Sequence, residues 1–224
     1  SKDKDTILKY ILKYILNKNL IGGLNMNKTI IQIGSHVGDT PNDPIFNKID
    51  KITTLILVEP VPYLFKQLKQ NYKNKNIDKI FFINKAVSNY IGTIELTVPS
   101  QENDFNKLPY WASQLASVNE KHAMTHINNI KTEKICVKTT TINEIITNYN
   151  VKEIELLHTD TEGHDYEILM NYSFDLKPKK ILFEHKHMDG TFKVGEKYKL
   201  LTNKLEKLGY KLEYNTDSDT MYTL

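Results

Sequence analysis

Short apolar runs alternate along the chain with segments of helical periodicity, and this alternation constrains the fold more than any other feature. Each run is followed by a glycine or a polar residue. The runs occupy residues 29–33, 55–58, 80–83, 154–158 and 180–183. This pattern is typical of an α/β domain in which a mostly parallel, doubly wound sheet has helices on both faces. A chain of 224 residues can bury a core for one such domain, and we expect residues 1–224 to form it.

The segments around these strands carry recognisable helix signals. Residues 61–72 place apolar side chains at helical spacing, and residues 198–208 do the same before Gly209 ends the helix. Thr141 and Glu144 form a capping box that predicts a helix through Tyr149. The last two apolar stretches, 210–214 and 221–224, enclose several turn residues and predict a C-terminal antiparallel hairpin. Dinucleotide dehydrogenases continue with parallel strands instead.

The middle of the chain departs from the simple alternation. Residues 93–98 and 134–139 alternate polar and apolar, which predicts strands with one wet face. The single cysteine, Cys136, is expected to be a buried strand residue, and with no second cysteine there is no intrachain disulfide. Between these strands, residues 99–131 form a long polar insertion with a few aromatics, which predicts a lid or binding loop.

The N-terminal residues 5–17 predict a helix with a narrow polar stripe and a wide apolar face. That face can pack on the domain's own sheet, on a second copy in a homodimer, or on a membrane surface. The stretch is too short and too charged for a transmembrane helix, and no cleavage signal follows it. We therefore expect a soluble protein of a reducing, cytoplasmic compartment.

All basic residues are lysines, and the chain has no arginine. With abundant Ile and Asn, this composition suggests a source with an A/T-rich genome, such as a virus or a protist. The formal net charge of +3 is spread over segments of mixed sign, so there is no strong signal for a nucleic-acid partner. Anions must be held by lysines, backbone N–H groups or helix N-termini.

In open α/β sheets ligands bind beyond the carboxyl ends of the strands, and there the chain is strongly polar. Gly34 and Gly38 bracket a G-x-x-x-G turn after the first strand, where backbone can approach a ligand at the start of a helix. This turn lacks the pattern that binds a pyrophosphate. Glu59, at the end of the second strand, can accept hydrogen bonds from ribose hydroxyls, or it can cap the next helix.

Residues 33–38, 58–60, 86–88 and 160–165 together resemble motifs of the FkbM family of S-adenosylmethionine-dependent methyltransferases. The D-x-E-G-x-(D/E) element at 160–165 is the most specific of these, and the resemblance spans residues 29–214. It implies a class I, Rossmann-like methyltransferase fold and O-methylation of a sugar, glycan or small natural-product-like acceptor. The cofactor residues that it implies are Gly34, Ser35, His36, Gly38, Glu59, Pro60, Ala86, Val87 and Asp160.

Two positions depart from the family's pattern. The first motif generally begins with an acidic residue, where this chain has Gln32. It generally continues as Gly-Ala-Asn, where this chain has Gly34, Ser35 and His36. The first departure removes a carboxylate that could hold the methionine ammonium group.

For catalysis, Asp160 and Glu162 follow the fourth strand, and Glu184 and His185 follow the fifth. Neighbouring strand ends bring such groups together. They can supply a base through Asp160, Glu162 or His185, or a Mg²⁺ site from Asp160, Glu184 and His185. The two acids of the fourth strand can instead cap the following helix, whose dipole is expected to lower their pKa values.

Acceptor binding is expected from Trp111, Ser113 and Ser117 of the insertion and from His164, because aromatic rings and polar groups suit a sugar-like ligand. The other four histidines after Gly38 have no assigned role at this stage: His122, His126, His158 and His187. Two alternatives stay open. They are a methyltransferase of RNA caps or ribose and a catalytically inactive nucleotide-binding module.

Overall fold

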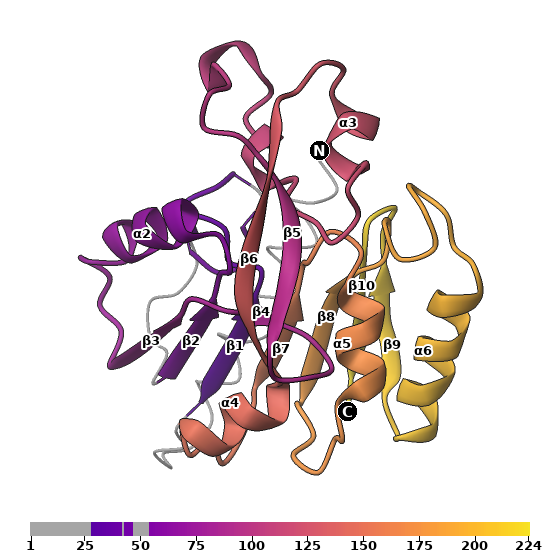
Figure 1. Cartoon of the computed structure of the whole chain (residues 1–224). Coiled ribbons are helices and arrows are strands. Elements are labelled where there is room, and N and C mark those ends of the chain that lie inside the picture. Colours follow the sequence, from indigo (N-terminus) through magenta and orange to yellow (C-terminus); the bar gives the residue numbers. More distant parts are fainter. Residues whose placement is uncertain (1–27, 42, 47–53) are drawn as a thin grey trace.

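The structure, a computed structural model, describes residues 28–41, 43–46 and 54–224. Its centre is a seven-stranded sheet in the order β3-β2-β1-β7-β8-β10-β9 (Figure 1). The strands are β1 (Thr29–Ile33), β2 (Thr54–Val58), β3 (Lys79–Ile83), β7 (Leu156–Thr159), β8 (Lys180–Glu184), β9 (Lys211–Asn215) and β10 (Asp219–Thr223). The first five run parallel, and β10 is antiparallel to both β8 and β9. The predicted α/β class, mostly parallel sheet and C-terminal hairpin are confirmed.

Strand order reverses between β1 and β7, which is where a doubly wound sheet opens a crevice for a ligand. Every residue of β1, β7 and β8 is buried, as expected for central strands covered on both faces. The carboxyl ends of β1 and β7 are in register, with Ile33 opposite Thr159. The segments that follow these two strands are therefore neighbours.

Helices cover both faces of the sheet. The apolar side chains of α4 (Ile142–Asn148), α5 (Asp165–Asn171) and α6 (Glu196–Lys207) pack with one face, and those of α2 (Pro62–Asn71) pack with the other. The capping box is present in part, because the Thr141 hydroxyl accepts a hydrogen bond from the backbone N–H of Glu144 at 3.1 Å. These helices leave the carboxyl ends of the strands uncovered, which is where the site lies.

A second sheet carries the insertion. β6 (Thr132–Thr140) pairs antiparallel with β5 (Thr93–Pro99) and parallel with the short β4 (Ala86–Val87). Between β5 and β6 the chain forms two short 3₁₀ turns, η2 (Phe105–Lys107) and η3 (Ala112–Gln114), and the helix α3 (His122–His126). In Figure 1 this segment rises from the end of the β5–β6 ribbon. The insertion is thus ordered around a ribbon that extends from the domain.

The structure differs from two of the expectations, and a third falls on residues that it does not describe. The glycine turn after β1 does not open a helix, because residues 34–41 and 43–46 form turns and bends. Cys136 lies in β6 as predicted, but its side chain is exposed because it falls on the wet face of the ribbon. The predicted helix 5–17 lies outside the described residues. Within the described ranges, the helices are all too short or too polar to cross a membrane.

Candidate functional site

A pocket with about 920 Å³ of empty space, open solvent included, lies at the carboxyl ends of the central strands. Of the residues predicted to bind a cofactor, the following line it: Gly34, Ser35, His36, Glu59, Pro60, Ala86, Val87 and Asp160. Glu162, Ser117 and His164 line it as well. The structure therefore brings together residues that are far apart in sequence and that the motifs had selected separately.

The close contact between the ends of β1 and β7 requires a glycine at position 34. Its backbone is left-handed, with φ +78°, and a Cβ atom there would lie 1.9 Å from the carbonyl oxygen of Asp160. The Asp160 N–H in turn donates to the Ile33 carbonyl at 3.0 Å.

Gly38 has a different role from the one predicted. It does not line the pocket, and a Cβ there would meet the ring of Tyr72 at 2.6 Å.

Glu59 performs part of the capping role considered for it. It is buried, and its two carboxylate oxygens accept the backbone N–H groups of His36 and Val61, each at 2.8 Å. One carboxylate thereby joins the glycine turn to the start of α2. Burial raises the pKa of Glu59 to about 7, against the opposing effect of the two N–H donors. Because each oxygen has a second lone pair, the group still has acceptor capacity towards the pocket.

Gln32 stands where the family has an acid, and an acid lies beside it. The Gln32 side-chain N–H donates to the Asp43 carboxylate at 2.8 Å, and both residues line the pocket. Asp43 also accepts the backbone N–H groups of Ile45 and Phe46, at 2.7 and 2.6 Å, which fixes its position. The Gln32 Oε1 atom is buried and has no hydrogen-bond partner within the protein. An acceptor of this kind needs a donor from a ligand or from water.

The loop between β7 and α5 holds Glu162 in an uncommon conformation. Glu162 has φ +53°, in the left-handed region that non-glycine residues rarely occupy. Asp165, fully buried, anchors the loop by accepting the backbone N–H and the hydroxyl of Thr161, at 3.2 and 2.8 Å. Gly163, with φ +104°, allows the close approach of the His187 carbonyl. Backbone strain of this kind concentrates at functional sites.

Three carboxylates gather around one lysine. Lys186 forms an ion pair with Glu184 at 2.7 Å, and its charge also acts on Asp160 and Glu162. Burial, then the negative charge of Glu162, raises the pKa of Asp160 well above its usual value. Burial and the charges of Asp160 and Glu162 do the same for Glu184. Burial would also raise the pKa of Glu162, but the hydrogen bond from His122 and the charge of Lys186 outweigh it and lower that pKa.

The predicted lowering of the pKa by a helix dipole is therefore wrong for Asp160. The physical reason is distance along the chain. The helix α5 begins only at Asp165, with His164 as its N-cap residue, so its N-terminal N–H groups do not face Asp160. Dipole effects fall off within the first turn of a helix. Burial beside a second carboxylate dominates instead.

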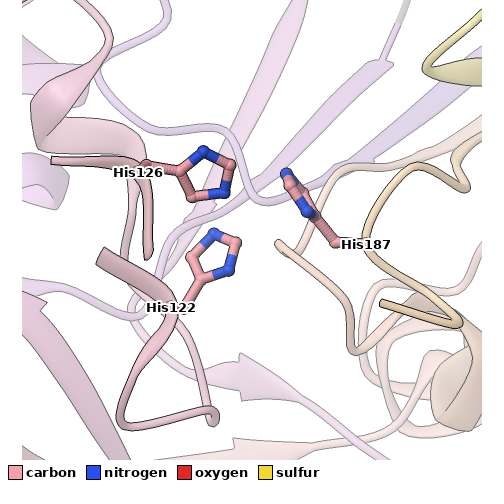
Figure 2. A group of neighbouring side chains, drawn as sticks. All are labelled: His122, His126 and His187. Atoms are coloured by element: carbon pink, nitrogen blue, oxygen red, sulfur yellow. The ribbon is translucent and has the colours of Figure 1, made fainter. Parts of the chain in front are cut away.

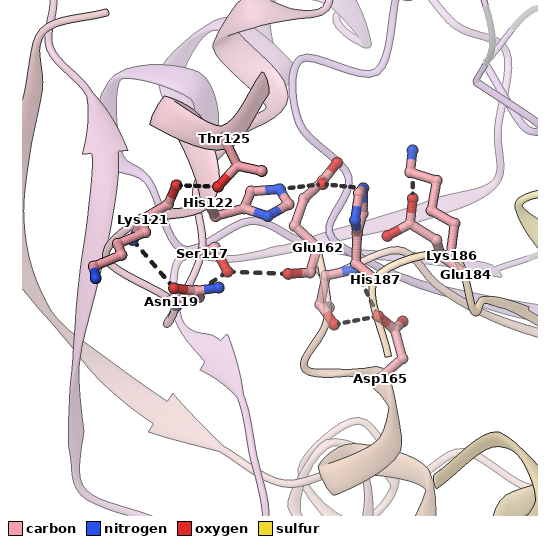
Figure 3. Close-up of polar contacts among 11 residues, drawn as sticks. Ser117, Asn119, Lys121, His122, Thr125, Glu162, Asp165, Glu184, Lys186 and His187 are labelled. Atoms are coloured by element: carbon pink, nitrogen blue, oxygen red, sulfur yellow. Dashed lines mark hydrogen bonds and ion pairs between the residues drawn. The ribbon is translucent and has the colours of Figure 1, made fainter. Parts of the chain in front are cut away.

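Histidines surround the Glu162 carboxylate. His122 donates to it at 2.7 Å, and the His187 Nε2 atom lies 3.3 Å from the same oxygen (Figure 3). The rings of His122, His126 and His187 face one another, with centroids 4.6 to 5.0 Å apart (Figure 2). Burial lowers the pKa of His187 to about 3, and burial followed by the nearby His122 lowers that of His126. Burial therefore favours the neutral form of both rings.

His185 does not join this group, which corrects the predicted ligand set of Asp160, Glu184 and His185. Its backbone N–H donates to the Ser218 carbonyl, and its Nδ1 atom forms a hydrogen bond of 2.9 Å with the Thr220 hydroxyl. The C-terminal hairpin thus holds His185. Among the described residues, the potential metal ligands that the structure clusters are Glu162, Glu184 and His187, and the three histidines of Figure 2.

Hydrogen bonds join the insertion to the site. Ser113 bonds with the His36 ring at 3.1 Å, and the Ser117 hydroxyl donates to the Glu162 carbonyl at 3.0 Å. His164, also predicted for the acceptor, bonds with Ser88 at 3.0 Å and lines the large pocket.

Trp111 borders a second pocket of about 620 Å³. Its other lining residues are Tyr110, Gln114, Leu115, His126, Glu162, Lys186, His187 and Phe192. Glu162 and Gln114 line both pockets.

Residues 32–212 match the methyltransferase FkbM domain, which is most of the chain. The chain belongs to the FkbM methyltransferase family. This match confirms the family to which the motifs pointed, and with it a methyltransferase dependent on S-adenosylmethionine. Among curated proteins, none matches the sequence.

Solved methyltransferase structures show a distant likeness to this FkbM protein. Fibrillarin of Aeropyrum pernix, with natively bound S-adenosyl-L-methionine, is 14% identical, with a TM-score of 0.43 over 88% of this chain and 66% of that one. Fibrillarin of Methanococcus jannaschii is 16% identical, with a TM-score of 0.40 over 91% and 70%. TrmK of M. capricolum, with S-adenosyl-homocysteine, is 11% identical, with a TM-score of 0.39 over 96% and 65%. The family assignment rests on the domain match alone.

Sequence reasoning missed several residues of the site in this FkbM protein. Lys186 carries no signal of its own, because it stands between two histidines and lysines are common in the chain. The spacing of His122 and His126, one helical turn apart, was a signal that could have suggested a shared ligand. Asp43 had no local signal, because its role depends on the fold of the turn after β1.

Gly34→Ala should disrupt the site, because the added Cβ would collide with the Asp160 carbonyl in a left-handed backbone. We expect a loss of about 3 kcal/mol or more in the free energy of unfolding, and loss of cofactor binding. Gly92→Ala is the matched control, because its Cβ would meet only the Tyr90 ring at 3.4 Å. Urea unfolding of both variants checks this, and equal stability would show that the contact can relax.

Proposed function

We propose that this FkbM protein transfers the methyl group of S-adenosylmethionine to a hydroxyl oxygen of a sugar, a glycan or a small natural-product-like acceptor. The observation that carries the proposal is the arrangement of two pockets that share Glu162 and Gln114. The larger has residues that suit a nucleoside-containing cofactor. The smaller has aromatic residues and a polar wall. An acceptor there would lie next to the cofactor across Glu162.

For the cofactor, the residues of the larger pocket offer matching polar groups. Glu59 has lone pairs available for ribose hydroxyls, and its two backbone bonds fix its orientation. The unpartnered Oε1 atom of Gln32 suits a donor such as the methionine ammonium group. Asp43, beside it, supplies the negative charge that Gln32 lacks. The pair of Gln32 and Asp43 would thus provide the carboxylate that the family's first motif generally supplies directly.

For the acceptor, three aromatic residues line the smaller pocket. Tyr110 and Phe192 are about two-thirds exposed, and Trp111 is half-buried. Exposed aromatic rings that border polar groups suit a sugar, because its C–H faces stack on rings while its hydroxyls bind polar atoms. Lys186 and Glu162 provide such polar atoms at the inner wall.

S-adenosylmethionine supplies an activated methyl group on a sulfonium. The protein has to hold the acceptor oxygen in line with the methyl–sulfur bond and accept the proton that the oxygen loses. Asp160 lines the cofactor pocket, and its raised pKa makes it a stronger base than an exposed aspartate. The bond from oxygen to methyl forms as the bond from sulfur to methyl breaks. The proton passes to the Asp160 carboxylate.

The role of Glu59 can be separated from its capping role. Glu59→Ala should weaken S-adenosylmethionine binding by about 1–3 kcal/mol in calorimetry, because polar partners lose their acceptor. The matched control is Asp189→Ala. Asp189 also accepts backbone N–H groups at a helix start, those of Gly195, Lys197 and Tyr198, but it lies outside both pockets. Asp189→Ala should lower the stability of the protein and leave its affinity for S-adenosylmethionine unchanged.

The same experiment has a pH arm. If the ribose hydroxyls donate to an ionised Glu59, affinity should fall as the pH drops through about 7, where Glu59 takes up a proton. Above that pH the affinity should be constant. Glu59→Ala should lose this pH dependence. A wild-type affinity that does not change with pH in this range, together with an unchanged affinity in Glu59→Ala, would remove Glu59 from the cofactor site.

The acceptor class is tested with isotopically labelled S-adenosylmethionine and a panel of sugars, glycans, natural-product alcohols and RNA. Transfer of the label to a sugar hydroxyl should appear. In Trp111→Ala the KM for the sugar should rise at least tenfold if stacking contributes about 1.4 kcal/mol or more. Asp160→Asn should lower kcat by about 100-fold or more while cofactor affinity survives. Labelling of RNA alone would replace the proposed acceptor. Cofactor binding without any transfer would favour an inactive module.

A further inference from the structure

His122, His126 and His187 bring three imidazole rings together although they come from two separate segments of the chain. His122 and His126 lie one turn apart on α3 of the insertion, and His187 follows β8. One ring nitrogen from each lies within 4.8 Å of the corresponding atoms of the other two. Figure 2 shows the rings turned toward a common centre. No backbone pairing between these two segments requires this arrangement.

Two nitrogen atoms of this group lack partners. The Nε2 atom of His126 and the Nδ1 atom of His187 are buried and make no hydrogen bond within the protein. Buried polar atoms are nearly always satisfied, and two buried unpartnered nitrogens in one group of three imidazoles point to a missing ligand. Neutral imidazole is also the form in which histidine binds a metal.

Glu162 borders this group as its acidic neighbour. Its Oε2 atom lies 2.7 Å from the His122 Nε2 atom and 3.3 Å from that of His187, and it forms a separate set of potential ligand atoms with Glu184 and His187. Ligand nitrogens held about 2.0–2.1 Å from a tetrahedral zinc ion are about 3.4 Å apart, so the three imidazole nitrogens, which lie within 4.8 Å of one another, need to move by only about 1 Å. Glu184 is not required, because Lys186 already neutralises it at 2.7 Å.

We infer that His122, His126 and His187 form a binding site for a transition-metal ion of the zinc type, beside the Glu162 carboxylate. Three imidazoles with a fourth position open are a donor set for Zn²⁺ or a similar first-row ion, whereas Mg²⁺ takes an octahedron of oxygens. The site is distinct from the Mg²⁺ site considered at Asp160, Glu184 and His185.

A metal ion bound at this position would have two effects. It would cross-link the insertion to the segment after β8, because each supplies ligands. It would also border the smaller pocket, since His126, His187 and Glu162 line that pocket. An ion there would be accessible to an acceptor hydroxyl and could lower its pKa. The metal-binding inference itself does not depend on the acceptor or on methyl transfer.

The test uses the full chain, stripped of metal with a chelator and titrated with Co²⁺ and Zn²⁺. We expect about one equivalent of Co²⁺ to bind with the visible absorption of a four-coordinate ion, Zn²⁺ to displace it, and millimolar Mg²⁺ not to compete. His126→Gln should weaken binding by about 100-fold or more, since loss of a ligand exceeds the ~10–100-fold cost of losing a second-shell partner. His126 is partly exposed on the insertion, so this substitution spares the core.

His185→Gln is the matched control, because it removes a buried histidine near β8 that the inferred site does not use. It should bind the ion as the wild type does. Wild-type protein that binds less than a tenth of an equivalent would overturn the inference, as would unchanged binding in both His126→Gln and His187→Gln. Loss of the ion in His185→Gln alone would move the site to the other ligand set. Calorimetry with S-adenosylmethionine on the same samples tests the proposed function separately.

Discussion

A carboxylate buried between two pockets, that of Glu162, is the group on which the arrangement of the site depends. Removing a carboxylate from water costs several kcal/mol unless charges and hydrogen bonds replace the hydration. Here the replacement comes from the hydrogen bond of His122, which the insertion supplies, and from the charge of Lys186 in the segment after β8. Both lower the pKa of Glu162. The loop that carries Glu162 therefore cannot be positioned independently of either segment.

This dependence explains why the insertion contacts the core where it does. Ser117 binds the Glu162 carbonyl while His122 binds its carboxylate, so the insertion recognises both the backbone and the side chain of one residue. Ser113 adds a contact to the glycine turn. Together these polar contacts fix the insertion at the edge of the pocket that Glu162 lines.

The sequence allowed much of the fold and of the cofactor pocket to be predicted, because those features depend on local pattern. Apolar runs located the strands, and the residues just after them, such as Glu59 and Asp160, line the pocket as expected. The histidine cluster depends on contacts between distant segments. His122 and Glu162 are 40 residues apart, and His36 and Ser113 are 77 apart. His185, one of the predicted metal ligands, lies outside the cluster because pairing with β10 and the turn before it draws its ring toward Thr220.

The two departures from the family's first motif are related to this architecture. His36 has a left-handed backbone, φ +49°, and its ring reaches Ser113, so the residue that replaces the usual asparagine also fastens the insertion to the glycine turn. Gln32 keeps a carboxylate near the pocket indirectly, through Asp43. A glutamine that pairs with a nearby acid keeps an acceptor atom free without adding another ionised group to the pocket. That matters in a site where Asp160, Glu162 and Glu184 are already crowded around one lysine, because a further buried negative charge would raise the pKa values of all three.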